Sequence, residues 1–134
     1  MNEHTKLVME KYDWEPSPVP FERTYRTMSN LDDRYENGIH DYLKFAKFGY
    51  GRGTDHAAKD IRHGYMTRDE GIEMVRKYDH VRSSDLQIWL DYVDRKEEWF
   101  DAIANGFRDS RVWRQDDNGE WFKRNIWDED EYRD

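Results

Sequence analysis

The stretch KFGYGRGTDHAAKDIRHGYMTR (residues 47–68) decides how the chain is expected to fold, because its glycines interrupt a series of helical patterns. Gly49, Gly51 and Gly53 fall within five positions, and a basic helical run follows them. Gly49 is suited to end a helix, since glycine adopts left-handed backbone angles at little cost. The next helix is predicted over Thr54–Arg62. We call the segment from the first of these glycines to the last the glycine hinge.

Helical periods flank the glycine hinge on both sides. Upstream, from Asn37 onward, apolar residues recur at i, i+3, i+4 and i+7, which predicts a half-buried helix. These residues are Ile39, Tyr42, Leu43 and Ala46. Downstream of Gly64, three more helices are predicted, each from a polar residue followed three positions later by Glu or Gln, as in a capping box. The pairs are Thr67 with Glu70, Ser84 with Gln87, and Asp94 with Glu97.

The two ends of the chain carry other patterns. Thr5–Trp14 predicts a short helix with Leu7, Val8 and Tyr12 as contact residues, and the prolines that follow it favour extended backbone. Near the other end, Asn118-Gly119 lies between aromatic-bearing flanks, which predicts a β-hairpin.

These patterns together predict a mainly α fold. It is a small bundle of about five short helices with a C-terminal β-hairpin and an irregular N-terminal segment. We expect a short helix and a proline-containing loop over residues 1–36, a helical domain with the terminal hairpin over 37–127, and an acidic tail over 128–134. There is no internal repeat and no sign of a second domain.

The composition limits the class of protein. Only 36% of the residues are hydrophobic and 39% are charged, but 6 Trp, 9 Tyr and 6 Phe provide large buried areas, so we expect a thin, aromatic-rich core. Cysteine is absent, which excludes disulfides and thiolate metal sites. Without a run of about 20 apolar residues or a signal peptide, the chain is expected to be cytoplasmic, with no membrane insertion.

The charge is distributed unevenly. The chain carries a formal net charge of −8, which argues against nucleic acid as a partner. Residues 44–68 nevertheless hold six Lys and Arg against two Asp, whereas residues 116–134 hold eight acids against three bases. One basic segment in an acidic chain indicates a local anion site.

The glycine hinge has the chemistry of such a site. If Thr54 is the N-cap of the next helix, the following amides point outward with the positive end of the helix dipole. Arg52 then offers a planar fork for two phosphate oxygens, and Lys59 a movable point charge. The alternative is structural: the glycines only end a helix and make a turn, and Asp55–Lys59 is a surface i,i+4 pair. The residues alone leave both open.

Other polar clusters are weaker candidates for a functional site. His56, Asp60 and His63 share a helical face. Their side-chain ends are spread over two helical turns and would converge poorly on one metal ion, so no metal site is expected. A bond from His56 to Asp60, or a role for His56 as donor or proton carrier, is favoured instead. We interpret Ser83 and Ser84 as helix starts rather than nucleophiles, and Asp32, Asp33 and Glu36 as part of a solvated loop.

One long stretch resembles a known family. RTYRTMSNLDDRYENGIHDYLKFAKFGYGRGTDHAAKDIRHGYMTRDEGIEMVRKYDH, with DLQIWLDYV, FRDSRVW and NIW after it, is similar to the carboxy-terminal part of the N-acetyl sugar amidotransferases. That family belongs to the PP-loop ATP pyrophosphatase group and works in lipopolysaccharide and surface-sugar biosynthesis. The resemblance covers about Arg23 to Trp127.

The resemblance implies chemistry on a nucleotide-linked N-acetyl sugar. ATP and Mg²⁺ activate the acetamido oxygen, and ammonia from a glutaminase partner displaces it to give an acetamidino group. The family's Ser-Gly-Gly-x-Asp-Ser loop is not in this sequence. We therefore expect no cofactor within this chain and no adenylation by it alone, whether it is a fragment that acts with a PP-loop domain or a free-standing module.

The resemblance also suggests where ligand contacts lie, although it identifies no catalytic residue. We expect the nucleotide-linked sugar, or another phosphate-bearing ligand, to contact residues of the hinge, the following helix and the stretch before them. These residues are Tyr50, Arg52, Thr54, Asp55, His56, Lys59, Arg62, Arg26 and Asn37. The alternative function is a non-catalytic helical module that binds a protein partner.

Overall fold

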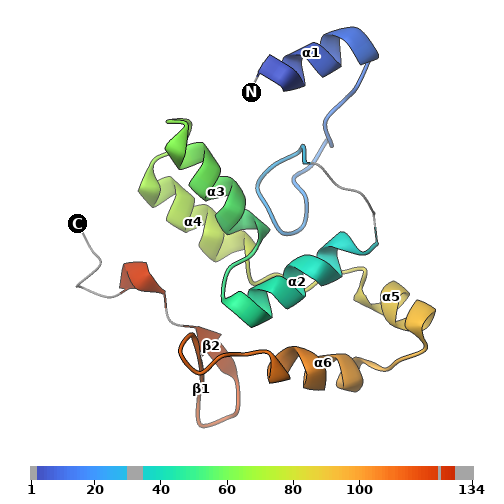
Figure 1. Ribbon diagram of the computed structural model, residues 1–134, viewed down its shortest axis with the longest axis vertical. Helices are drawn as coiled ribbons and strands as arrows, with labels where there is room; N and C mark the ends of the chain where they lie inside the picture. The colour runs from blue at the N-terminus through green and yellow to red at the C-terminus, as the bar shows by residue number, and fades with distance from the viewer. Residues whose placement is uncertain (1–2, 30–34, 124, 129–134) are drawn as a thin grey trace.

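The computed structural model describes residues 3–29, 35–123 and 125–128 (Figure 1). Within them, six α-helices precede a two-stranded hairpin and a short 3-10 helix. The helices are α1 (Glu3–Tyr12), α2 (Asn37–Phe48), α3 (Arg52–Arg62), α4 (Arg68–Tyr78), α5 (Leu86–Val93) and α6 (Glu97–Gly106). The remaining elements are β1 (Trp113–Gln115), β2 (Trp121–Lys123) and η1 (Ile126–Asp128). The predicted mainly α fold with a C-terminal hairpin is confirmed.

The apolar core lies among α2, α5 and α6. Ile39 from α2, Leu86 and Leu90 from α5, and Phe100 and Ala104 from α6 form one buried cluster. Partly buried side chains from α2 and α5 pack against its edge, so most of the upstream apolar stripe faces this core. The i, i+3, i+4 spacing therefore places the expected side chains inside.

A second helical layer pairs α3 with α4, which lie side by side in Figure 1. Ala57 is buried on α3, and Val75 on α4. Gly71 allows the close approach, because a Cβ there would lie 2.7 Å from Ile61 Cδ1. This pair presents the N-terminus of α3 and the C-terminus of α4 at the glycine hinge.

Several predicted helix ends are confirmed. Gly49 ends α2 in the left-handed conformation, with φ of +77°. Thr67 and Glu70 form a reciprocal capping box at the start of α4. The hairpin also forms, with Trp113 opposite Lys123 and Gly119 at positive φ in the turn. These features depend on neighbours in sequence.

Two predicted helix starts are wrong. The N-cap of α5 is Asp85 without a side-chain cap, and the amide of Ser84 instead donates to the carboxylate of Glu22, at 2.8 Å to Oε1. Asp94 ends α5 at φ of +53°, and the N-cap of α6 is Lys96. At the first of these starts, the carboxylate of the distant Glu22 binds the Ser84 amide. At the second, Asp94 adopts a left-handed conformation and ends α5 instead of starting α6.

The helix α1 lies at the edge of the molecule (Figure 1). None of its described residues is buried, so the expected contact residues Leu7, Val8 and Tyr12 are exposed. In contrast, the loop after α1 buries Arg23 and Thr24 completely or nearly so. The irregular N-terminal segment is therefore part of the packed structure.

The acidic end of the chain is only partly described. Asp128 forms an ion pair with Arg76 of α4, with Nη2 and Oδ1 2.7 Å apart. The rest of the expected tail and the carboxylates Asp32 and Asp33 lie outside the described residues. In the part of the chain that the structure covers, no helix has the length and apolar character needed to cross a bilayer.

Candidate functional site

The glycine hinge holds a carboxylate that comes from the end of α4. Asp79 is 2% exposed, and its Oδ2 accepts hydrogen bonds from the Gly51 amide at 2.9 Å and the Thr54 hydroxyl at 2.5 Å. Its Oδ1 accepts from the Thr54 amide at 3.1 Å. The first amides of a helix have no intrahelical partner and attract negative charge. Asp79 thus caps α3 from outside that helix.

The hinge glycines make room for this carboxylate. A Cβ at Gly53 would lie 2.6 Å from Asp79 Oδ1, and one at Gly51 would lie 3.1 Å from the same atom. The N-cap is Gly51, so the prediction that Thr54 starts the helix is wrong. Because Asp79 provides the capping oxygens, the hinge needs small residues rather than a local capping side chain. Asp79 therefore occupies the amides that were one candidate site for a phosphate.

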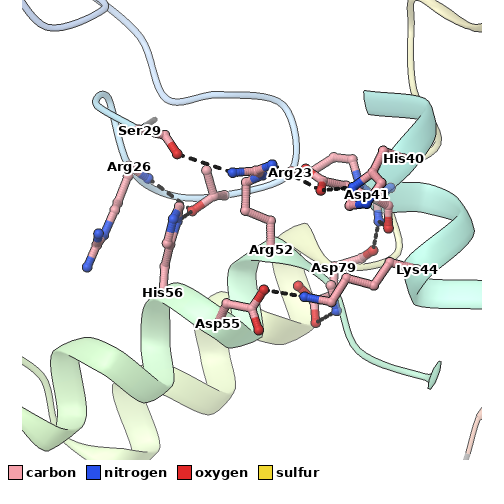
Figure 2. A network of polar contacts seen from close by, with 12 residues as sticks. Arg23, Arg26, Ser29, His40, Asp41, Lys44, Arg52, Asp55, His56 and Asp79 are labelled. Carbon is pink, nitrogen blue, oxygen red and sulfur yellow. Dashed lines mark hydrogen bonds and ion pairs between the residues drawn. The ribbon is translucent and has the colours of Figure 1, made fainter. Parts of the chain in front are cut away.

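Arg52 also faces a carboxylate of the protein itself. Its Nη2 donates to Asp41 Oδ1 at 3.1 Å and its Nε to Asp41 Oδ2, which is a forked ion pair. Its Nη1 donates to Ser29 Oγ at 3.2 Å. Figure 2 shows this guanidinium between the N-terminal loop and α2. Arg52 therefore joins three segments of the chain.

A buried arginine lies beside both carboxylates. Arg23 is 3% exposed, and its Nη2 donates to the Asp79 carbonyl at 2.5 Å and the Asp41 carbonyl at 3.4 Å. Burial lowers the pKa of Arg23, and the charges of Asp41 and Asp79 oppose that shift. Its Nε and Nη1 have no hydrogen-bond partner among the described residues. Besides its two hydrogen bonds to carbonyls, the guanidinium is stabilised by the nearby negative charges and by the Tyr42 ring, 5.5 Å away.

Sequence reasoning missed the three residues that organise this region. Arg23, Asp41 and Asp79 are far apart in the chain, and none lies in a recognisable motif. The available signals were weak: Arg23 opens the stretch that carries the resemblance, and Asp79 directly follows the apolar stripe of α4. Neither signal indicates burial.

His56 on α3 is held by the N-terminal loop. Its Nδ1 lies 2.7 Å from the hydroxyl oxygen of Thr24, so the predicted bond to Asp60 is wrong. Burial, with help from the cations Arg26 and Arg52, lowers the pKa of His56 to about 4. The imidazole is therefore neutral at physiological pH and does not supply positive charge for an anion.

Asp60 bonds instead to two residues of the same loop. It accepts from the Tyr25 hydroxyl and from Arg26 Nη2, the latter at 2.5 Å. Burial and this bond to the carboxylate raise the pKa of Tyr25 to about 12. The phenol thus stays protonated and fixes one oxygen of Asp60, which orients Arg26 beside α3.

A cavity of about 790 Å³ opens where α1, the N-terminal loop and α3 meet. We call it the Lys59 cavity. Tyr25, Arg26, Lys59 and Tyr65 are among the residues that line it. Lys59 is exposed and forms no ion pair with any described residue, whereas Arg26 is paired with a carboxylate. Of the nine predicted contact residues, the cavity brings these two cations together.

The other predicted contacts do not line the Lys59 cavity. Tyr50 lies under the ammonium of Lys44, with Nζ 4.7 Å from the ring centre. Asp55 pairs with Lys44, so the alternative prediction of an Asp55–Lys59 pair is wrong. Arg62 is exposed at the end of α3, and Asn37 is the first residue of α2.

The described residues include no cluster of side chains arranged as metal ligands. No group of three or more His, Asp or Glu side chains among them is placed to hold a metal ion. The hinge amides of Gly51 and Thr54, which could cradle a phosphate, are bonded to Asp79.

Comparison with known proteins finds a family whose model matches most of this chain. The family described as "LPS biosynthesis protein WbpG-like, C-terminal domain" matches residues 20–126, from the loop that carries Arg23 to the start of η1. None of the curated proteins matches the chain. The matched range covers most of the sequence and includes the hinge, Asp41 and Asp79. The chain therefore belongs to the family of WbpG-like C-terminal domains of LPS biosynthesis proteins.

Proposed function

We propose that this domain is the substrate- and phosphate-binding part of an ATP-dependent N-acetyl sugar amidotransferase. The enzyme would convert the acetamido group of a nucleotide-linked sugar into an acetamidino group. The family's place in LPS biosynthesis supports a sugar substrate. The observation that carries the proposal is the Lys59 cavity, of about 790 Å³, which is lined by a lysine that pairs with no carboxylate among the described residues. That volume is within the range of ligand pockets, about 300–1,000 Å³.

The lining residues suggest separate roles in binding. Lys59 supplies the free positive charge for the sugar diphosphate, and Arg26 supplies directed donors, since Asp60 fixes its guanidinium. Tyr25 and Tyr65 offer flat surfaces for a ring. Arg52 is a positioning residue in this scheme, because its guanidinium forms an ion pair with Asp41 of α2.

The adenylation step would take place on a different domain. An amide oxygen leaves poorly until it becomes part of an activated group, which is the contribution of ATP and Mg²⁺ in this chemistry. We place both on a PP-loop domain, and the ammonia on a glutaminase partner. The chain by itself is then expected to release no pyrophosphate from ATP, with or without sugar and ammonia. Release above a protein-free blank contradicts this part of the proposal.

Calorimetric titration with a uridine-diphosphate N-acetyl sugar tests binding in the Lys59 cavity. Lys59→Ala is expected to weaken binding by roughly tenfold, the effect of one charge-assisted contact. Lys77→Ala, which removes an exposed lysine that does not line the cavity, serves as the matched control and is expected to have no effect. Equal affinities for the two variants, or no binding by the unmodified chain, would overturn the assignment.

A second candidate function is docking of a protein partner, which an exposed apolar row on α6 favours. Trp99, Ile103 and Phe107 recur at i, i+4 and i+8 and are 41%, 39% and 45% exposed. Such a row suits a helix-packing interface. We propose that the PP-loop domain is the partner that docks on this row of side chains. Ile103→Asp is expected to prevent co-purification with that domain and to leave binding of the nucleotide-linked sugar unchanged. If the variant still co-purifies with the domain but loses sugar binding, this role for the row is excluded.

A further inference from the structure

A second cavity, of about 380 Å³, lies between the C-terminal hairpin, η1, α2 and α4. We call it the hairpin pocket. Its walls are largely aromatic and include Phe45, Trp113, Trp121 and Trp127. It shares no lining residue with the Lys59 cavity, and none of the predicted contact residues borders it. The hairpin pocket is thus a separate site for which the proposed function gives no role.

Arg108 lines this pocket, and one N–H group of its guanidinium has no partner among the described residues. Its guanidinium lies 4.1 Å from the ring centre of Trp113 and 5.6 Å from that of Trp121. Its Nε donates to Asn105 Oδ1 at 3.0 Å, whereas its Nη1 is buried and has no hydrogen-bond partner among the described residues. A buried donor left unpaired is unfavourable, and a ligand oxygen that accepted its hydrogen bond would remove that cost. Burial also lowers the pKa of Arg108, against the opposing effects of nearby Tyr42 and Asp101.

Two further polar groups complete the pocket. Lys123 donates to the Gly49 carbonyl, and its Nζ lies 5.7 Å from the Phe45 ring centre and 5.5 Å from that of Trp127. Asn125 donates through Nδ2 to Asp128, but its Oδ1 is buried without a partner among the described residues. Two residues that line the pocket, Arg108 and Asn125, therefore each carry a buried polar atom without a partner among the described residues.

The charge balance of the hairpin pocket differs from that of the whole chain. The chain carries a formal net charge of −8, yet Arg76, Arg108 and Lys123 all line this pocket. Its one described carboxylate is Asp79, whose oxygens are bonded to the hinge. The aromatic walls suit a flat ring, and aromatic residues with a few convergent polar groups are typical of ligand sites.

The geometry points to a binding site for a small phosphate monoester that carries a ring. The phosphate lies against Arg108 and Lys123, the ring packs against Trp121, and a ring N–H or hydroxyl donates to Asn125 Oδ1. A volume of about 380 Å³ suits a compact ligand. The ring is a nucleobase, which stacks through its flat face, or a pyranose, which packs its C–H bonds against an aromatic ring; both carry a hydrogen-bond donor.

Binding to the full chain is measured by calorimetry and by quenching of tryptophan fluorescence with three probes: uridine 5′-monophosphate, glucose 1-phosphate and inorganic phosphate. At least one ring-bearing probe is expected to bind saturably and roughly tenfold more tightly than inorganic phosphate, because stacking adds to the charge contact. The probe that binds identifies the ring. If neither ring-bearing probe binds saturably, or if inorganic phosphate binds as tightly, the assignment is overturned.

Variants locate the site. Arg108→Gln and Asn125→Ala are each expected to weaken binding by roughly fivefold or more, since each removes one polar contact. Arg111→Gln is the matched control, because Arg111 is highly exposed, pairs with Asp109 and does not line the pocket. Asn125→Ala keeps the test valid if Arg108→Gln does not fold. Loss of binding in Arg111→Gln, or unchanged binding in Asn125→Ala, contradicts the site.

Discussion

Asp79 accepts hydrogen bonds from the Gly51 amide and from both the amide and the hydroxyl of Thr54, and it lies beside the buried guanidinium of Arg23. A carboxylate in this position neutralises two positive features, the N-terminus of α3 and Arg23. At the scale of single residues, the hinge region is therefore a set of buried charges that satisfy one another. Removing one of them leaves the others without a partner.

Asp79→Ala is expected to lower the free energy of unfolding by about 3–5 kcal/mol, the usual cost of breaking a buried charge pair. Glu73→Ala removes an exposed carboxylate from α4 and is expected to change it by no more than about 0.5 kcal/mol. Urea denaturation followed by circular dichroism measures both. Similar midpoints for the two variants would show that Asp79 does not stabilise the hinge.

The pKa of His56 predicts a pH dependence of stability. Its folded pKa of about 4 is below the ordinary value of 6.5, so the unfolded chain binds more protons between these values. The contribution is fully present above pH 6.5 and is lost as the pH falls toward 4, by up to about 1.4 kcal/mol per pH unit. In His56→Gln this component is expected to disappear from unfolding curves measured across that window. Parallel curves for the two proteins, or an NMR titration of His56 near 6.5, contradict it.

At the scale of elements, the connection between α2 and α3 depends on the conformation of Gly49 and on its contacts. The residue has φ of +77°, and a Cβ there would lie 2.4 Å from Val112 Cγ1. Its carbonyl accepts a hydrogen bond from Lys123 of β2. The end of α2 and the hairpin are thus in direct contact at a position where only glycine fits.

Comparison of two glycines separates backbone strain from packing. Gly64 has φ of +73° but no atom within 4 Å of a built Cβ, so Gly64→Ala is expected to cost only the left-handed backbone penalty, about 1–2 kcal/mol. Gly49→Ala is expected to cost about 1–3 kcal/mol more, because the methyl group overlaps Val112. Thermal unfolding of the two variants measures the difference. Equal losses would mean that the hairpin moves away at no cost.

At the scale of the whole molecule, the helices serve two purposes. The core among α2, α5 and α6 and the α3–α4 pair stabilise the domain, whereas α1 has no buried residue and borders the Lys59 cavity through His4, Thr5 and Val8. Figure 1 shows α1 at one end of the structure. Its contribution is therefore expected in ligand binding rather than in stability.

Removal of residues 1–12 tests this division. The shortened chain is expected to unfold within about 1 kcal/mol of the full chain, since little apolar surface is lost from the core. Its affinity for a uridine-diphosphate N-acetyl sugar is expected to fall severalfold, because one wall of the cavity is gone. Denaturation and calorimetry on the same samples measure both. A large loss of stability, or unchanged affinity, would contradict this role for α1.

The sequence by itself determined the features that depend on residues close together in the chain. The left-handed end of α2 at Gly49, the Thr67–Glu70 capping box and the Asn118-Gly119 turn are confirmed, because a few neighbouring residues form each of them. The apolar stripe of α2 likewise predicted which side chains enter the core.

Only the tertiary structure decided what the glycine hinge holds. Asp79 is 28 residues from Gly51 along the chain, and Arg52 reaches Asp41 on the preceding helix. Sequence patterns predicted a phosphate-bearing ligand at the start of α3, but the amides there are bonded to the Asp79 carboxylate, since an amide binds a carboxylate of the protein as readily as a phosphate. Which of the two is present depends on packing between distant segments, and packing brings Asp79 to that position.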